Sequence, residues 1–234
     1  ENKIHVNVEK PITANSHQGQ ALNALAKANN LKLAVGQSER FNPAVVELKK
    51  HLYSPSFIEM DRLAPYKARG ADVSVVHDLM IHDLDLVLSM DASPCKVVSA
   101  RGQKFMSPTL DVAACCLEFE SGLSVHIKSS RIVPALIRTM RVIDKDSNGG
   151  SKQFLANLTT GELEVTTPGL VDQVKAPVSQ KITTQKVDAL LVETELFVRS
   201  VTEDKPCAVS GEDGTRALEL VERIVDVIHS HHSS

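Results

Sequence analysis

The sequence of 234 residues predicts a fragment of a parallel α/β unit, followed by an α+β domain built on a large, mainly antiparallel sheet that helices cover on one side. Two observations lead to this prediction. Residues 1–37 show a strand, a helix and a strand with short connections, the pattern of a parallel βαβ unit. Residues 38–234 contain a long series of segments in which apolar and polar residues alternate, which is typical of antiparallel strands.

The βαβ unit begins with a strand over residues 4–8, which is apolar at every second position. Pro11 ends this strand because proline has no N–H for the ladder, and Thr13 can cap a helix that runs to Asn29. A second apolar strand, "LKLAVG", ends at Gly36. Two parallel strands cannot bury both faces of a sheet, so we expect either further parallel strands upstream or packing on the second domain.

The second domain is expected to open with a loop and a helix and then to form its sheet. Glycines in "ESGL" and "TTGE" predict hairpins between neighbouring strands. In chain order, the predicted elements are a helix over "AVVELKKHL", a strand at 57–60, a helix at 74–89, alternating strands from Lys96 onward, and helices at 187–202 and 211–230.

The composition excludes several classes of protein. Hydrophobic residues make up 42% and charged residues 24%, with a formal net charge of -3 and only 3% aromatic residues, so we expect no nucleic-acid partner. No apolar run approaches the ~18 residues of a membrane span. The four cysteines have no metal-site spacing and predict buried thiols in a cytoplasmic setting. The tail "HSHHSS" is expected to be a disordered end, and we expect no metal site.

The stretch "VHDLMIHDLDL" carries five titratable groups within a predicted helix. On an α-helix, Asp78, His82 and Asp85 lie within a sector of about 60°, whereas His77 and Asp83 point elsewhere. A carboxylate beside a histidine can orient the ring and stabilise its protonated form, which suits proton transfer. Spacing alone leaves two other interpretations open: a solvated helix face, and a divalent metal shared by an aspartate and a histidine four residues apart.

A second candidate is "VEKP", which places Lys10 at the carboxyl end of a parallel strand, where ligands bind in open α/β sheets. The ammonium of Lys10 could hold a substrate oxygen and stabilise negative charge as a proton leaves. The alternative is a solvated lysine in a turn.

Taken in order, these motifs resemble the Gfo/Idh/MocA oxidoreductases. The order is a strand ending in "EKP", a helix, an apolar strand ending in Gly, "RFNP", an Asp-x-x-x-His-x-x-Asp helix, an antiparallel sheet and the closing segment "FVRSVTEDKPCAVSGEDGTRALELVERI". Within that family, "GQSERFNPAV" and "DVSVVHDLMIHDLDLVL" are similar to nucleotide-sugar dehydrogenases that oxidise the 3-hydroxyl of UDP-N-acetylglucosamine. The resemblance implies that residues 1–37 are the last part of a Rossmann-like dinucleotide-binding domain. It also implies that residues 38–234 form the substrate-binding and oligomerisation domain.

The resemblance also implies roles for individual residues. Lys10 would contact the reacting hydroxyl, His82 would be the general base that takes its proton, and Asp78 would bind the substrate or orient His82. Arg131 would meet a diphosphate, because a guanidinium matches phosphate oxygens with two donors. The implied cofactor is NAD or NADP, bound by Glu9, Lys10, Pro11 and Gln37. The implied substrate is a sugar or nucleotide sugar, bound by Arg40, Asn42, Asp85 and Arg131.

One feature of the family is missing from these residues. The Gly-rich turn G-x-G-x-x-G that cradles a pyrophosphate does not occur in the sequence. We therefore expect this chain alone to bind NAD weakly or not at all and to be inactive, while the full-length form is an NAD(P)-dependent sugar dehydrogenase. The alternative is a catalytically silent module whose open sheet face mediates interaction. By resemblance, that face is also expected to form a homodimer or homotetramer.

Overall fold

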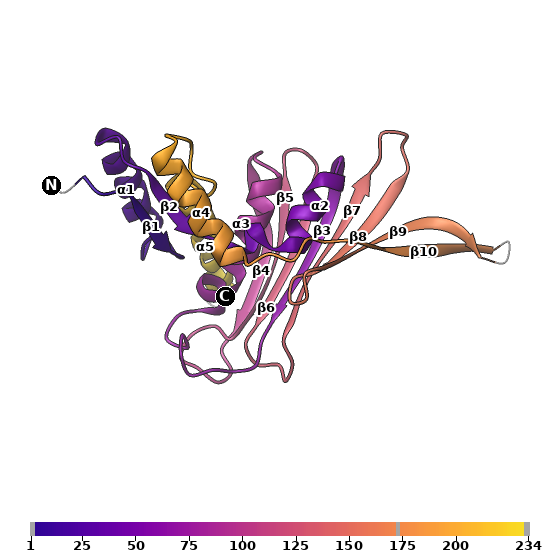
Figure 1. The fold of residues 1–234 in the computed structure, drawn as a ribbon. Helices are drawn as coiled ribbons and strands as arrows, with labels where there is room; N and C mark the ends of the chain where they lie inside the picture. The colour runs from indigo at the N-terminus through magenta and orange to yellow at the C-terminus, as the bar shows by residue number, and fades with distance from the viewer. Residues whose placement is uncertain (1–2, 172–173, 232–234) are drawn as a thin grey trace.

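The computed structural model describes residues 3–171 and 174–231 of the chain. They form a small α/β unit at one end and a broad sheet at the other, with helices packed on one face of the sheet (Figure 1). The last three residues of the tail, 232–234, lie outside the described part of the chain, and with them the prediction for the end of the tail. None of the helices in the described ranges is long and apolar enough to cross a membrane.

The elements follow the predicted order. They are β1 (Val6–Glu9), α1 (Ser16–Ala28), β2 (Leu33–Gly36), η1 (Ser38–Phe41), α2 (Pro43–His51), β3 (Ser54–Leu63), η2 (Val76–Met80), α3 (Ile81–Met90), β4 (Cys95–Gln103), β5 (Val112–Phe119), β6 (Ser124–Ser130), β7 (Ile137–Lys145), β8 (Ser151–Asn157), β9 (Glu162–Val171), β10 (Val174–Ile182), α4 (Ala189–Thr202) and α5 (Gly211–Ser230).

The small unit is a βαβ motif, as expected, with β1 and β2 paired in parallel. Helix α1 begins two residues later than predicted, because Asn15 and not Thr13 is its cap. The Asn15 side chain accepts a hydrogen bond from the backbone N–H of Gln18, while the Thr13 hydroxyl donates to the Asn15 carbonyl. Helix α5 packs against α1 and β2 on one side and against β4 on the other, and thereby joins the small unit to the large sheet.

Exposed apolar side chains are frequent on the small unit and on α4. Helix α4 buries Glu193 and Ser200 instead of its leucines, which is the reverse of an ordinary amphipathic helix. The exposed apolar side chains of these elements are Ile4, Val6, Leu22, Leu25, Leu190, Leu191 and Val198.

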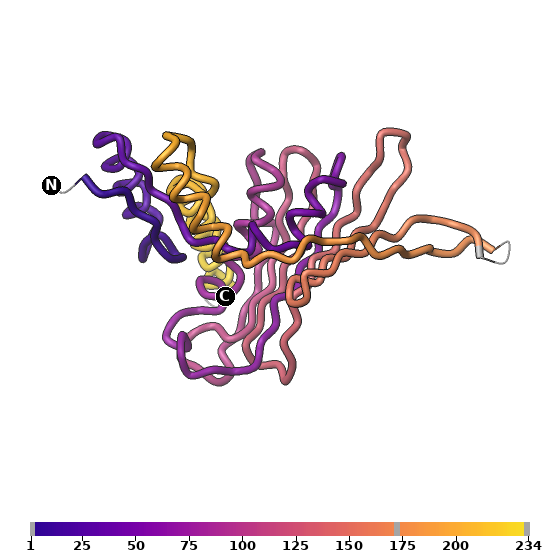
Figure 2. Tube along the Cα trace, viewed as in Figure 1, coloured from indigo at the N-terminus to yellow at the C-terminus, as the bar shows by residue number. Residues whose placement is uncertain are grey.

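The large sheet has eight strands in the order β10-β9-β8-β7-β3-β6-β5-β4. Strand β3 is longer than the predicted 57–60 and is inserted in the middle, parallel to β6 and antiparallel to β7. The predicted hairpins β5–β6 and β8–β9 are present, and Gly122 and Gly161 have the positive φ angles of 92° and 75° that their turns require. The β9–β10 hairpin projects away from the rest of the molecule (Figure 2).

Alternation along the strands separates the two faces of the sheet. Ile58, Met60 and Arg62 of β3 are buried beneath the helices, whereas Glu59 and Asp61 lie on the uncovered face. The neighbouring thiols of β5 divide in the same way: Cys115 is buried and Cys116 is only half-buried, as are Cys95 and Cys207. The prediction of buried thiols therefore holds for Cys115 alone.

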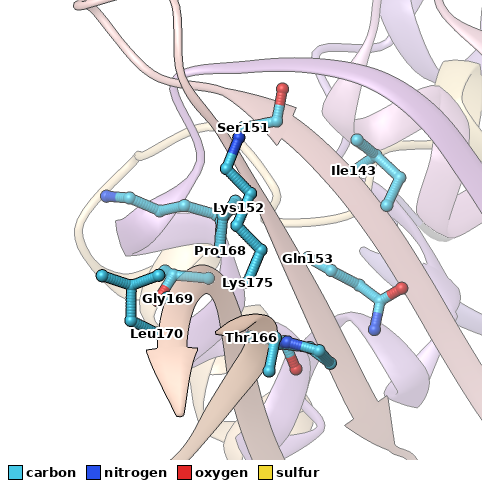
Figure 3. A pocket seen from close by; sticks show the side chains of 12 residues that line it. Ile143, Ser151, Lys152, Gln153, Thr166, Pro168, Gly169, Leu170 and Lys175 are labelled. Carbon is cyan, nitrogen blue, oxygen red and sulfur yellow. The ribbon is translucent and has the colours of Figure 1, made fainter. Parts of the chain in front are cut away.

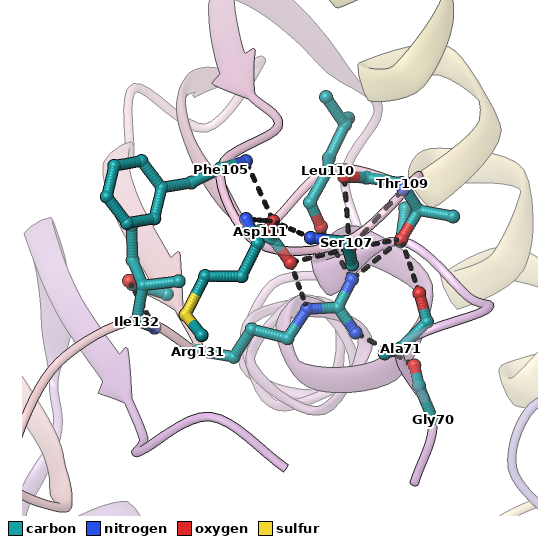
Figure 4. A network of polar contacts seen from close by, with 12 residues as sticks. Gly70, Ala71, Phe105, Ser107, Thr109, Leu110, Asp111, Arg131 and Ile132 are labelled. Carbon is teal, nitrogen blue, oxygen red and sulfur yellow. Dashed lines mark hydrogen bonds and ion pairs between the residues drawn. The ribbon is translucent and has the colours of Figure 1, made fainter. Parts of the chain in front are cut away.

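Arg131, which directly follows β6, lies in a buried network of polar contacts (Figure 4). It is 5% exposed, and its Nε donates to Asp111 at 2.8 Å. Its Nη1 donates to the carbonyl of Gly70, and its Nη2 to the carbonyls of Val73 and Leu110, each at 2.8 Å. Because the guanidinium serves the protein's own acceptors, these contacts favour a structural role for Arg131 over the predicted contact with a diphosphate.

Asp111 is the anion at the centre of this network. It is fully buried and accepts the backbone N–H groups of Phe105, Met106 and Ser107 together with the Ser107 hydroxyl. Burial alone would raise the pKa of Asp111, but the hydrogen bonds from Ser107 and from the three backbone N–H groups outweigh burial and hold the pKa far below its ordinary value. The network thereby ties the segment that precedes η2 to the loop between β4 and β5.

We predict that Asp111→Ala lowers the free energy of unfolding by about 3–5 kcal/mol, because it leaves the Arg131 guanidinium buried without its counter-ion. Urea unfolding measures this loss. Since the pKa of Asp111 is lower in the folded than in the unfolded state, its contribution is present above the unfolded value of about 4 and disappears as the pH falls below it.

The matched control is Asp226→Ala, an exposed aspartate on α5, which should change stability by less than about 0.5 kcal/mol. Equal stability of the two variants, or a difference from wild type that does not shrink in acid, would contradict this account of Asp111.

Candidate active site

The helix that carries the predicted Asp–His–Asp stripe is not a regular α-helix. It opens with the single π-helical turn η2 and continues as α3. π turns occur mostly inside α-helices and frequently at functional sites, because the extra residue re-aims the side chains around it. Asp78 lies in the π turn and His82 in the α-helical part, so their relation differs from that of two residues four apart on an ideal helix.

Lys10 meets Asp78 across the junction between the small unit and the large domain. The Lys10 ammonium donates to the backbone carbonyl of Asp78 at 2.6 Å and to its carboxylate at 2.9 Å. The Lys10 side chain is only 19% exposed. The structure thus brings together two of the three predicted catalytic residues, and it shows Asp78 holding Lys10, with no hydrogen bond to His82 among the described residues.

His82 is the third predicted catalytic residue, and its ring is set into a cationic environment. Its Nδ1 is buried and has no hydrogen-bond partner within the described chain. Burial lowers the pKa of His82 well below its ordinary value, and the charges of Arg62, Lys10 and Arg138 lower it further. The imidazole is therefore neutral at physiological pH and able to accept a proton.

Arg62 and Asp83, the residue after His82, form a buried ion pair that the sequence patterns did not reveal. Two nitrogens of Arg62 donate to one carboxylate oxygen of Asp83, at 2.6 and 2.8 Å, and a third donates to Glu39 at 3.0 Å. Burial alone would lower the pKa of Arg62, but the charges of Asp83 and Glu39 raise it above its ordinary value. Asp83 thus points away from the predicted stripe, as expected, yet it fixes α3 on the sheet.

Two predicted substrate residues, Arg40 and Asp85, pair with each other. Arg40 donates from two nitrogens to the two oxygens of Asp85, both at 2.6 Å, and lies 3.5 Å from Asp213 of α5. Asp85 is 1% exposed. The pair joins η1 to α3, and these internal contacts favour a structural role for both residues.

Asn42, also predicted to bind substrate, caps helix α2. Its side-chain oxygen accepts the backbone N–H of Ala44 at 3.1 Å, and its amide nitrogen donates to the carbonyl of Leu158 at 2.8 Å. Its amide is therefore used within the protein, which again favours a structural role.

The predicted cofactor residues lie at the carboxyl ends of β1 and β2. Gln37 follows β2, is 1% exposed, and both polar atoms of its amide are buried without a partner in the described residues. Gly36, the residue before it, is closely packed: a Cβ there would lie 3.1 Å from the carboxylate of Glu9 and 3.3 Å from that of Glu193. Pro11, which directly follows Lys10, is half-buried. Unsatisfied buried amides are costly, so Gln37 is suited to receive a polar ligand.

A separate, open groove lies at the other end of the molecule. It has a volume of about 900 Å³ and lies between β8 and the β9–β10 hairpin, and Gln153, Thr166 and Lys175 are among the side chains that line it (Figure 3). The hairpin is at the opposite end of the molecule from β1 (Figure 1), so the groove is separate from the Lys10–His82 cluster. Residues 3–171 and 174–231 contain no group of His, Cys, Asp and Glu side chains arranged to hold a metal ion.

The chain is similar to known proteins in both sequence and fold. Residues 56–143 match the model of the protein family described as "GFO/IDH/MocA C-terminal domain". The UDP-N-acetylglucosamine 3-dehydrogenase of Acidithiobacillus ferrooxidans is 32% identical over 216 residues, which cover 92% of this chain and 68% of that enzyme. A solved structure of that dehydrogenase aligns with a TM-score of 0.87 and 28% identity, covering 97% of this chain and 71% of the other.

A second relative, the scyllo-inositol 2-dehydrogenase (NAD(+)) of Bacillus subtilis, is 26% identical over 149 residues, which cover 57% of this chain and 44% of that enzyme. Both relatives are dehydrogenases of small polyhydroxylated compounds. On these matches and on the shared architecture, the chain belongs to the Gfo/Idh/MocA family of oxidoreductases.

Proposed function

We propose that the protein oxidises a hydroxyl group of a sugar or nucleotide sugar by hydride transfer to NAD or NADP, with His82 as the general base. The first substrate to consider is UDP-N-acetylglucosamine, oxidised at C3, because the relative of that name is 32% identical over most of this chain. The single observation that carries the proposal is the half-buried His82, whose pKa is depressed, on the same helix as the Asp78 that anchors the Lys10 ammonium.

His82 supplies the proton acceptor. A general base must be unprotonated to act, and burial and the surrounding cations keep this imidazole neutral. Its Nδ1 makes no hydrogen bond within the described residues, so the ring is not committed to another group on that side. A sugar hydroxyl placed against the ring would pass its proton to His82.

Lys10 supplies the electrostatic stabilisation. An ammonium has three donors, and Asp78 takes two of those of Lys10. The third can point at the substrate oxygen, where the positive charge stabilises the alkoxide that develops as the proton leaves. Asp78 fixes the direction of that donor, so its role in the proposal is to position Lys10.

The residues at the ends of β1 and β2 fit a nicotinamide group. The unsatisfied amide of Gln37 matches a carboxamide, and the exposed Glu9 at the end of β1 carries a carboxylate that suits ribose hydroxyls. When bound there, the nicotinamide ring would accept the hydride from the sugar carbon. The Bacillus subtilis relative carries NAD(+) in its name, which supports NAD as the first cofactor to test.

The uncovered face of the large sheet is proposed to pair with the same face of a second copy. Helices cover only the opposite face, and the uncovered one mixes the ion pair Asp61–Lys128 with the Phe57–His126 ring contact. A broad sheet face without a covering layer is an unusual surface for an isolated domain, and symmetric dimers commonly bury such faces.

For the enzyme, we predict that His82→Ala in the full-length protein lowers turnover of UDP-N-acetylglucosamine by about 10²–10⁴-fold, because the proton acceptor is lost. Absorbance of the reduced nicotinamide measures turnover, and Lys10→Met should lower it as well. In the wild type, activity should persist below the ordinary histidine pKa of about 6.5, since the pKa of His82 is depressed and protonation inactivates the base.

His77→Gln is the matched control, because His77 lies five residues away in η2 and bonds to Ser74 at 2.9 Å. The His77→Gln variant should oxidise UDP-N-acetylglucosamine at the wild-type rate. Undiminished activity of the His82→Ala variant across the pH range would remove His82 from the mechanism.

For the sheet face, we predict that the protein is a dimer or tetramer and that Ala114→Glu shifts it toward monomers. Ala114 is exposed on the uncovered face between Arg101 and Lys128, so the monomer tolerates a carboxylate there, whereas an interface must desolvate it. Light scattering measures the mass. Ala92→Glu, at an exposed site after α3, is the control, and a monomeric wild type would refute the proposed pairing.

A further inference from the structure

Three neighbouring strands place a row of polar residues on the helix-covered face, directly under α3. Ser129 of β6 pairs with Arg62 of β3, and Arg62 pairs with Arg138 of β7. Residues opposite each other in a sheet share a face, so Arg138 lies on the same side as Arg62 and as the α3 residue Asp83 that Arg62 binds. The two guanidiniums are therefore neighbours beside the proposed active site.

The two arginines differ in how well their donors are satisfied. Arg62 is 2% exposed and binds both Asp83 and Glu39. Within the described residues, Arg138 reaches only one carboxylate, and it does so with a long contact of 3.4 Å to the same Glu39 oxygen that Arg62 holds at 3.0 Å. Its Nε is buried with no acceptor in the described residues, although its side chain is 35% exposed.

The position of Arg138 also connects it to the reacting group. Its charge is one of the three that depress the pKa of His82, so it lies close enough to act on the imidazole. A part-exposed guanidinium that lies beside the base and has a single long contact to a carboxylate within the described residues is suited to receive an oxyanion with its remaining Nη donors. None of the motifs that identify the site includes this residue.

We propose that Arg138 is a specificity-determining residue that binds an oxyanion of the substrate, namely a phosphoryl group of a nucleotide sugar. The inference rests on the proposed dehydrogenase function and names the substrate class for the same site. It gives Arg138 the role that the sequence had indicated for Arg131, whose donors are used inside the protein. A neutral sugar would leave Arg138 without its partner and would bind more weakly.

The test compares charged and neutral ligands in binding and in turnover. Calorimetry with the full-length protein should show that Arg138→Gln lowers the affinity for UDP-N-acetylglucosamine by about 50-fold. This is the loss expected when hydrogen bonds to a charged group are removed. Free N-acetylglucosamine should bind wild type and variant equally weakly. Arg141→Gln is the matched control, because Arg141 lies three residues along β7 on the uncovered face and pairs with Glu59.

A second readout separates this role from a merely structural one. Removing the Arg138 cation should raise the pKa of His82 toward its ordinary value, so the acid limb of kcat/KM should move to higher pH in Arg138→Gln and stay in place in Arg138→Lys. Arg138→Lys keeps the charge but loses the two-pronged geometry, and should bind the nucleotide sugar with intermediate affinity.

The outcomes distinguish this inference from the function on which it rests. Equal affinity of wild type and Arg138→Gln for UDP-N-acetylglucosamine would overturn the role of Arg138. So would a loss of affinity for the neutral sugar that is as large as the loss for the nucleotide sugar. Wild-type turnover of neutral sugars with no preference for the nucleotide form would overturn it too, and would leave the dehydrogenase intact. Binding of the nucleotide sugar that depends on Arg138, without any turnover, would support the inference and refute the proposed reaction.

Discussion

The buried ion pair between Arg62 and Asp83 is the interaction on which the site depends. Arg62 projects from the central strand β3, and Asp83 meets it from α3, so the pair fixes the helix over the sheet at one register. Breaking such a pair by removing one partner typically costs about 3–5 kcal/mol, because the other charge stays buried. The same guanidinium lies beside His82 and disfavours its protonation. The contact thereby positions the base and adds to the effect of burial in lowering the pKa of His82.

Much of the fold follows from local patterns that the sequence displays. The alternation that continues from Lys96, the glycines of the hairpins and the helical spacing at both ends correspond to elements of the structure. The place of β3 in the middle of the sheet was not predictable, because strand order depends on long-range pairing and a short apolar run carries no information about its neighbours. The cap of α1 at Asn15 also differs from the predicted Thr13, since both residues suit a cap and only tertiary packing chooses between them.

The site was predictable where one segment carried the pattern and not where two segments had to meet. Lys10 and Asp78 were both predicted, but the two residues are 68 positions apart in the chain, so no local pattern indicates that they are in contact. The sequence does carry a signal for Arg62. Along β3 this arginine alternates in step with the buried residues Ile58 and Met60, and an arginine on the buried face requires a buried acid as its partner. Arg138 lies on the same face of the sheet as Arg62, because the two residues are opposite each other on β7 and β3. Only strand pairing reveals this, and only the buried contact with Asp111 distinguishes Arg131 from an arginine that binds a phosphate.

The central claim is that burial and neighbouring cations hold His82 neutral as the proton acceptor. The most direct measurement is an NMR titration of the histidine ring signals in the full-length protein, with the His82 signal assigned from its loss in a His82→Gln variant. A signal that stays in the neutral form well below the ordinary pKa of about 6.5 is the predicted result. A midpoint at or above that value would show a histidine that is charged when the reaction needs it neutral, and would contradict the account.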